Sequence, residues 1–221
     1  MTLIEAVVVL FLTALLVMML VPGLIGQRDQ HRAPRIRCIY NLKQLGLAYK
    51  IWAGDNNDKL PMEVSVTNGG TMELMNTPDA WKTFQVMSNE LSTPKTIYCP
   101  ADSTRNFATN WGDDLKHKIS YFIGVDATET NLTAFLSGDD MFLLNQTTVP
   151  PGRFDVAATA PLEWDDNRHG DIVKQGWFTA PKKIGYGNLL LGDGSVQATS
   201  NPTLTYYLTQ TGLATNLLFV P

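Results

Sequence analysis

The sequence predicts an α+β fold, in which a long N-terminal α-helix precedes a globular head built on an antiparallel β-sheet. Residues 1–27 are apolar and carry one charged side chain, Glu5. Apolar residues then recur at three- and four-residue steps through residues 28–53, as on one face of a helix. Residues 54–221 contain short strand-like runs bounded by turn residues. We therefore expect residues 1–53 to form the helix and residues 54–221 to form the head.

The apolar run 1–27 is long enough to cross a membrane as a helix. At about 1.5 Å per residue it would reach roughly 40 Å, against a hydrocarbon core of about 30 Å. It starts Met-Thr-Leu-Ile-Glu, without the basic residues of a cleavable secretory signal. A plain membrane anchor is one interpretation. However, an acid such as Glu5 is costly in lipid, and Pro22 beside Gly23 should kink or locally unwind the helix.

The segment 28–53 is predicted to be an amphipathic neck helix. Pro34 should mark a kink or a new helix start. The turn-forming residues 53–61 should end the helix, and their spacing does not match a calcium-binding EF-hand loop. The apolar stripe expected to pack on the head consists of Ile36, Ile39, Tyr40, Leu42, Leu45, Ala48, Tyr49 and Trp52.

Charge is distributed unevenly along the chain, whose net charge is −4. Residues 28–50 hold six basic side chains and one acid, whereas residues 51–221 have a net charge of −8. The head has no basic patch with interleaved aromatic residues, so we predict no nucleic-acid binding. The basic neck would suit phospholipid head groups or acidic groups on another copy of the chain.

The head is predicted to combine short strands with one helix and long loops. The helix is expected over Asp79–Leu91. The segment 199–211, rich in Thr and Ser, could be a pair of surface strands or a site of O-glycans. The best hairpin joins 188–191 to 195–197 through Gly192-Asp193-Gly194. The predicted strands are Thr96–Cys99, Ile119–Val125, Met141–Leu144, Gly187–Leu191 and Ser195–Thr199.

The N-terminus resembles that of mature type IV pilins and type II secretion pseudopilins, through Met-Thr-Leu-Ile-Glu and the uncharged run containing Pro22. The resemblance implies a leader removed by a prepilin peptidase, N-methylation of Met1, and passage through the inner membrane to an assembly platform. It also implies that the apolar helices pack into a filament core. There, Glu5 would neutralise the terminal amine of an adjacent subunit. Pro22 and Gly23 would let the subunits adjust their rise and curvature in the filament.

Motifs further along the chain resemble a bacterial pilin-like family that is abundant in planctomycete- and verrucomicrobial-type genomes. The first is Cys38 followed by Asn-Leu-Lys-Gln-Leu-Gly-Leu-Ala at residues 41–48. The second is the C-terminal element formed by His169 and Asp193-Gly194. The spacer between His169 and Asp193 is longer here than in the family, and an insertion at 171–184 would account for the difference.

The chain has two cysteines, Cys38 and Cys99. A disulfide between them would pin the head to the neck, a device suited to the outside of the cytoplasm. The alternative is two buried free thiols.

Several head residues could carry a ligand or a modification. Asp165, Asp166 and Asp193, with His169, could bind a divalent metal. The resemblance to major pseudopilins implies calcium, with Asp139 and Asp140 as further candidates. The alternative is a polar loop whose side chains cap and turn the backbone. Asn131 and Asn145 fit the pattern of glycosylation acceptors.

No enzymatic motif appears. The sequence lacks a serine-hydrolase elbow, a glycine-rich nucleotide loop and a haem-attachment motif, and it has three histidines in all. We therefore expect no enzyme and no required cofactor. The predicted function is a structural major subunit of an extracellular type IV pilus-like filament, a helical polymer of identical chains. The alternatives are a major pseudopilin of a periplasmic filament and a membrane-anchored binding or enzymatic domain.

Overall fold

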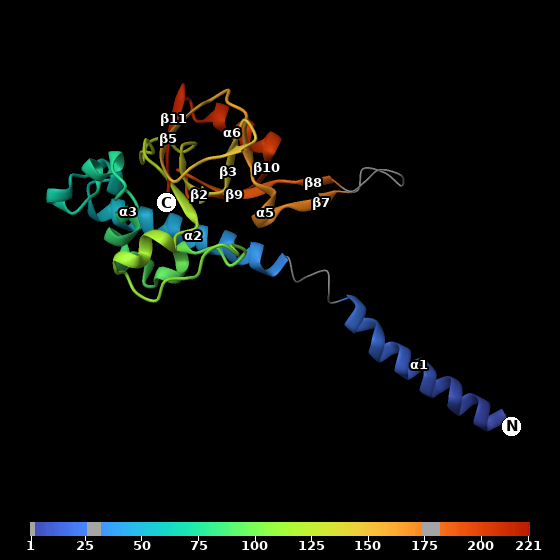
Figure 1. The fold of residues 1–221 in the computed structure, drawn as a ribbon. Helices are drawn as coiled ribbons and strands as arrows, with labels where there is room; N and C mark the ends of the chain where they lie inside the picture. Colours follow the sequence, from blue (N-terminus) through green and yellow to red (C-terminus); the bar gives the residue numbers. More distant parts are fainter. Residues whose placement is uncertain (1–2, 26–31, 174–181) are drawn as a thin grey trace.

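A computed structural model describes residues 3–25, 32–173 and 182–221 of the chain. Helix α1 spans Leu3–Ile25 and helix α2 spans Arg32–Asp55. In Figure 1, α1 extends away from the head, whereas α2 lies against it. The predicted processing site at Met1, and the predicted boundary between residues 27 and 28, lie outside the described residues.

Helix α1 displays apolar side chains on every side. The large apolar residues from Leu3 to Met18 are 43–82% exposed. The helix remains helical through Pro22 and Gly23 and ends at Ile25, so the unwinding predicted at Pro22 is not found. Over the described residues, none of the helices is both long and apolar enough to count as a membrane span.

Helix α2 buries one face against the head and leaves the opposite face exposed. Pro34 lies in its first turn, where a missing N–H costs nothing, which confirms the predicted new start. The sequence placed Ile36 and Tyr40 on the buried stripe, but they are 64% and 61% exposed. The reason is geometric. At about 100° per residue, they share a face with Leu47 and Ile51, opposite the buried face. We call Ile36, Tyr40, Leu47 and Ile51 the outer stripe. The buried face consists of Cys38, Leu42, Leu45, Ala48, Tyr49 and Trp52.

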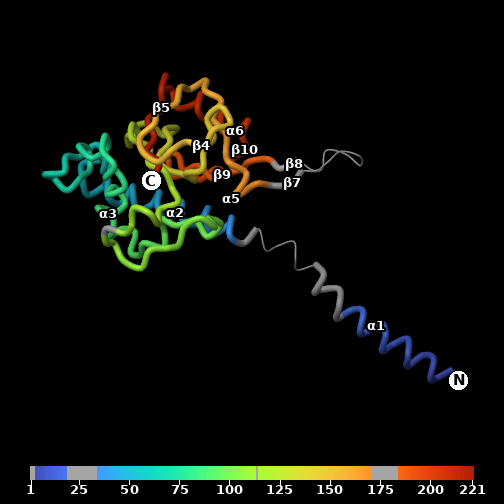
Figure 2. Tube along the Cα trace, viewed as in Figure 1, coloured from blue at the N-terminus to red at the C-terminus, as the bar shows by residue number. Residues whose placement is uncertain are grey.

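The head is built on a six-stranded sheet in which every neighbouring pair is antiparallel, as predicted. The strand order is β10-β9-β2-β1-β11-β5. Figure 2 draws the chain as a tube in the same view as Figure 1. The strands are β1 (Tyr121–Gly124), β2 (Phe135–Asp139), β5 (Gly152–Ala157), β9 (Tyr186–Leu191), β10 (Val196–Ser200) and β11 (Thr215–Val220).

Alternating side chains along these strands fill two separate cores. Tyr121 and Ile123 of β1 pack with the buried face of α2, while Phe122 between them points into the other core. That second core is closed by helix α6 (Asn201–Gln210) and a small sheet in which Phe142 stacks on Trp164. The small sheet consists of β3 (Phe142–Leu144), β4 (Thr147–Thr148) and β6 (Leu162–Trp164).

Short helices connect α2 to β1. The helix predicted over Asp79–Leu91 is divided at Met87 into α3 (Lys82–Val86) and α4 (Ser88–Leu91). The strand predicted at Thr96–Cys99 is wrong. Pro94 and a cap from the Thr93 hydroxyl start a 3₁₀ helix there instead. The 3₁₀ helices are η2 (Pro61–Glu63), η3 (Val66–Asn68), η4 (Met72–Asn76), η5 (Pro94–Ile97) and η6 (Asp113–His117).

The other four predicted strands correspond to β1, β3, β9 and β10. The predicted hairpin is confirmed as the β9–β10 pair, and Gly194 adopts a φ of +83° in its turn. The segment 199–211 is not a strand pair. Most of it is α6, because Leu204 and Leu208 fall one turn apart and both are buried. The segment 171–184 contains a ribbon of β7 (Asp171–Val173) paired with β8 (Lys182–Ile184).

A disulfide joins Cys38 of α2 to Cys99, which confirms the predicted bridge. It links positions 61 residues apart and lies in the core between α2 and the sheet. Close approach of the helix is helped by Gly46, where a Cβ would lie 2.8 Å from a methyl carbon of Leu190. The neck and the head are therefore covalently tied as well as packed.

We predict that removing the bridge lowers the free energy of unfolding by about 4 kcal/mol, because the unfolded chain gains loop entropy. Cys38→Ala, Cys99→Ala and the double variant should lose similar amounts, since each breaks the same bond. Urea unfolding followed by tryptophan fluorescence measures the change. Additive losses in the double variant, or no loss at all, would contradict a bridge that stabilises the fold.

Candidate functional site

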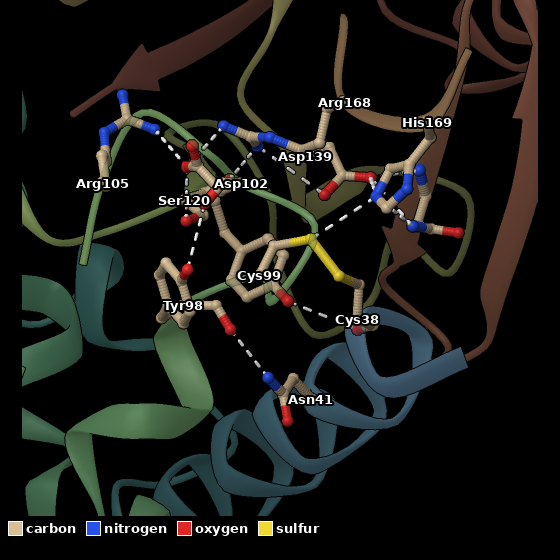
Figure 3. Close-up of a disulfide and its surroundings, with 12 residues drawn as sticks. Cys38, Asn41, Tyr98, Cys99, Asp102, Arg105, Ser120, Asp139, Arg168 and His169 are labelled. Atoms are coloured by element: carbon tan, nitrogen blue, oxygen red, sulfur yellow. Dashed lines mark hydrogen bonds and ion pairs between the residues drawn. A yellow bond between two sulfur atoms is a disulfide. The ribbon is translucent and has the colours of Figure 1, made fainter. Parts of the chain in front are cut away.

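A cluster of charged side chains lies buried beside the disulfide, where β2, β9, the Cys99 loop and the one-turn helix α5 (Asp166–His169) meet (Figure 3). Each member is buried or nearly so. The cluster contains three acids, two arginines and one histidine. We call this set the buried charge cluster, and it consists of Asp102, Arg105, Asp139, Asp140, Arg168 and His169.

Arg168 is the centre of the cluster. Its Nη2 donates to Asp102 Oδ2 at 2.7 Å, and its Nη1 donates to Asp140 Oδ1 at 2.8 Å and to the Ser120 carbonyl at 2.9 Å. Arg105 reaches the same two carboxylates, at 3.1 and 2.8 Å. A guanidinium suits this position because its planar fork can serve two carboxylates at once.

Asp102 anchors the loop that follows the disulfide. Its backbone N–H donates to the Cys99 carbonyl, which closes a turn. Its Oδ1 accepts from the N–H and hydroxyl of Thr104, at 2.9 and 2.6 Å, while its Oδ2 accepts from the Ser120 hydroxyl at 2.8 Å. The loop conformation and the cluster are therefore coupled.

His169 is the next residue after Arg168 and points to the other side of α5, toward the disulfide (Figure 3). Its Nε2 lies 3.4 Å from Cys99 Sγ and 3.3 Å from Asp139 Oδ2. Asp139 Oδ2 also accepts from the backbone N–H and the side-chain amide of Asn188 on β9, at 2.7 and 2.9 Å. Helix α5 carries both Arg168 and His169. Its start is capped by Asp165, whose side chain accepts a hydrogen bond from the Asn167 N–H.

The pKa values of the three buried carboxyl groups do not all shift in the same direction. Burial by itself raises the pKa of Asp102, but Arg168 and three hydrogen bonds outweigh it and hold the pKa at about 2. Burial is likewise outweighed at Asp139, chiefly by His169, so that pKa is lowered. At Asp140, burial dominates over the two arginines and the pKa is raised. Arg168 remains charged, because its three acids more than offset its burial and raise its pKa.

The cluster has little room for a substrate. The recess beside it, lined by Asp102, Thr104, Met141 and Arg168 among others, has a volume of about 10 Å³. Ligand pockets usually measure hundreds of Å³. What this arrangement can do is lock four segments together, because removing one partner of a buried ion pair costs about 3–5 kcal/mol.

A larger recess, of about 280 Å³, lies elsewhere, near the C-terminus. Its lining includes Lys116, Arg153 and Phe219 and contains no histidine, cysteine or acidic side chain. It therefore presents basic and apolar groups together with the neutral polar side chains of Asn76 and Thr77.

His169 and Asp193-Gly194, which the sequence analysis grouped as one C-terminal element, lie in different parts of the head. His169 belongs to the buried charge cluster, whereas Asp193 caps the β9–β10 turn by accepting from the Ser195 N–H at 2.8 Å. Asn188 on β9 contacts His169, whereas Asp193 lies five residues further along, in the turn that follows the end of β9 at Leu191. Gly194 supplies the left-handed residue of that turn.

The group of potential metal ligands that converges among the described residues is not the acidic one predicted from the sequence. Among the described residues, Asp165, Asp166 and Asp193 do not form a convergent group of ligand atoms, because Asp165 caps α5 and Asp193 caps the hairpin turn. Asp139 and Asp140, the other calcium candidates, face Asn188 and Arg168 instead. The one group of three potential ligands within the described ranges is Cys38, Cys99 and His169.

The two glycosylation patterns lie in different settings. Asn131 is half-buried, and its side-chain amide donates to the Thr211 carbonyl at 3.1 Å. Asn145 is exposed, with a φ of +52°, in the two-residue turn between β3 and β4.

Sequence reasoning missed the roles of Asp102, Arg105 and Arg168. One signal was available in the sequence. Arg168 directly precedes His169, and adjacent residues of this kind are candidates for buried ion pairs. The partners come from residues 66 and 28 positions away, however, and spacing alone does not identify them.

Comparison of the chain with protein-family models, with curated proteins and with solved structures finds no match.

We predict that acid weakens the fold through Asp102. Its folded pKa of about 2 lies below the ordinary 3.8, so its contribution is complete above pH 4 and is lost as the pH falls toward 2. The shift corresponds to about 2 kcal/mol. Urea unfolding at pH 4 and pH 2 should show the advantage of the wild type over Asp102→Asn shrinking by that amount. An advantage that does not change between the two pH values would contradict this coupling.

Proposed function

We propose that this chain is a structural subunit of a helical filament outside the cytoplasm, assembled from identical copies through α1 and the exposed face of α2. The observation that carries the proposal is the continuous apolar surface of α1, which the head does not cover.

Burial of α1 among copies of itself would supply a large driving force. A helix that is apolar all round is typical of a buried environment. Phe11 and Leu16, for example, are 65% and 62% exposed in the single chain. Burying one such side chain is worth about 1.5–3 kcal/mol, so a few neighbours per subunit would hold a polymer together.

The outer stripe extends this surface into the neck. Tyr40 and Leu47 are each 61% exposed, although their helix is otherwise a core element of the head. The charges on this part of the neck are basic: Arg37 and Lys43 are exposed, whereas Lys50 pairs with Glu129 at 2.6 Å. An apolar stripe edged with free cations matches the surface of a neighbouring head, because residues 51–221 carry a net charge of −8.

The head suits an exposed location. The Cys38–Cys99 disulfide is of the kind that persists in oxidising compartments, and the buried charge cluster stiffens the loop beside it. Neither feature requires a cofactor. In this proposal the head is the outward-facing part of the filament, and any surface ligand binds there.

Assembly would follow the route implied by the pilin resemblance. A prepilin peptidase would expose Met1, and the chain would wait in the inner membrane before joining the filament at an assembly platform. Glu5, the one charged residue in the apolar run, would neutralise the terminal amine of a neighbour. A secretion pseudopilin would use the same contacts in a shorter periplasmic filament.

The test compares two leucines of similar exposure, Leu47 on the outer stripe and Leu132 on the head, which are 61% and 56% exposed. We predict that Leu47→Lys reduces fibres in sheared cell-surface material at least about tenfold, because a lysine would have to be desolvated between subunits. Leu132→Lys should leave fibre yield within about twofold. Electron microscopy and immunoblotting of the sheared fraction measure both.

The same experiment separates a filament from a membrane-anchored domain. Leu47 lies outside the apolar run, so its substitution should leave the total amount of membrane-associated chain unchanged. Absence of wild-type fibres containing this chain, or equal yields from the two variants, would contradict the proposed assembly.

A further inference from the structure

Three potential metal ligands converge inside the head, at the disulfide. The Sγ atoms of Cys38 and Cys99 and the Nε2 atom of His169 all lie within 4.8 Å of one another, and all three residues are buried. The imidazole points directly at the bridge in Figure 3. His169 Nε2 lies 3.4 Å from Cys99 Sγ. In a tetrahedral zinc site, sulfur and nitrogen ligands are separated by about 3.5 Å, given bond lengths of about 2.3 and 2.0–2.1 Å.

A fourth potential donor, Asp139, lies beside the histidine, outside the group of three converging ligand atoms. Asp139 Oδ2 lies 3.3 Å from His169 Nε2, which again matches the separation of two ligands around tetrahedral zinc, about 3.3 Å. The other oxygen, Oδ1, is buried and makes no hydrogen bond to any described residue. Asn188 holds the carboxylate from behind through two hydrogen bonds to Oδ2. A metal ligand supported by such a hydrogen bond is typical of zinc sites.

We propose that the reduced form of this chain binds one zinc ion through Cys38, Cys99 and His169, with the Asp139 side chain turning toward the ion as the fourth ligand. The oxidised form cannot bind it, because its sulfur atoms are bonded to each other. The bridge between α2 and the Cys99 loop would therefore exist in two versions, a disulfide or a thiolate–zinc–thiolate link. This inference is independent of the proposed filament.

The exchange balances as a two-electron reduction followed by metal binding. A thiol or phosphine reductant supplies two electrons to the S–S bond, which breaks, and each sulfur takes one proton. Zinc then displaces both protons from the thiols, and two protons leave to solvent. The ion and two thiolates are together neutral, so the link adds no net charge to the buried charge cluster. This matters because an uncompensated charge in such surroundings is costly.

The donor set selects the metal. Two thiolates, one imidazole and one carboxylate are ligands that zinc accepts in tetrahedral geometry. Calcium, the ion expected from the resemblance, prefers six to eight oxygen ligands and would not take the sulfur atoms. The closed, buried setting is that of a structural zinc rather than a catalytic one, because no position is open to a substrate.

The test uses the full-length chain in detergent, refolded either oxidised or with a phosphine reductant, and dialysed against micromolar zinc. Bound zinc is measured by atomic absorption, and cobalt substituted for zinc reports thiolate ligation by its near-ultraviolet charge-transfer band. We expect one zinc per reduced chain and less than about a tenth of that per oxidised chain. Circular dichroism records whether each form is folded.

A matched pair of histidine variants tests the ligand set. His169→Gln should weaken zinc binding by at least about tenfold, since even the loss of a residue that only supports a ligand costs about 10–100-fold. His117→Gln makes the same change at an exposed histidine in η6 and should bind as the wild type does. The Cys38→Ala/Cys99→Ala variant should bind no zinc under either condition.

Several results would overturn the inference. One is a folded, reduced chain that takes up no zinc, and another is equal affinity of the two histidine variants. If the reduced chain unfolds without metal, zinc should restore its circular dichroism spectrum in the wild type and fail to do so in His169→Gln. Failure to restore the wild type would equally refute the site.

Discussion

The structure depends on helix α2 having two different faces, one buried against the sheet and one exposed. One face, including Leu42, Leu45 and Tyr49, is the floor of the main core and packs against the six-stranded sheet. The opposite face carries the outer stripe, whose side chains are 46–64% exposed in the part of the chain that the structure describes. The helix that organises the head therefore also presents an apolar surface outward, and the apolar α1 precedes it in the chain. The proposed filament follows from that surface.

The other constraint is the buried charge cluster. Arg168 would be too costly to bury alone, so its charge is compensated by Asp102 from one segment and by Asp139 and Asp140 from another. Such a network contributes less to net stability than its short distances suggest, because each group also loses its water. It does specify one arrangement of the loop around Cys99, and thereby it positions His169 against the disulfide.

The sequence was most informative where the signal is local. Period-two alternation and turn residues located β9, β10 and their hairpin, and helical spacing located α2. It was least informative where partners are distant. The orientation of Ile36 and Tyr40 depends on which face the sheet covers. Leu204 and Leu208 make 201–210 a helix only because a second core exists to bury them. The buried charge cluster was not predicted for the same reason, since its pairs join remote segments.

The central claim is that the outer stripe contacts a second copy of this chain. The most direct measurement places a photoreactive phenylalanine analogue at Tyr40 in producing cells and, as the matched control, at Tyr206 of α6; the two side chains are 61% and 58% exposed. After illumination, denaturing gels should show covalent dimers and higher multimers from position 40, and several-fold fewer from position 206. Crosslinks from position 40 that never join two copies of the chain would contradict the account.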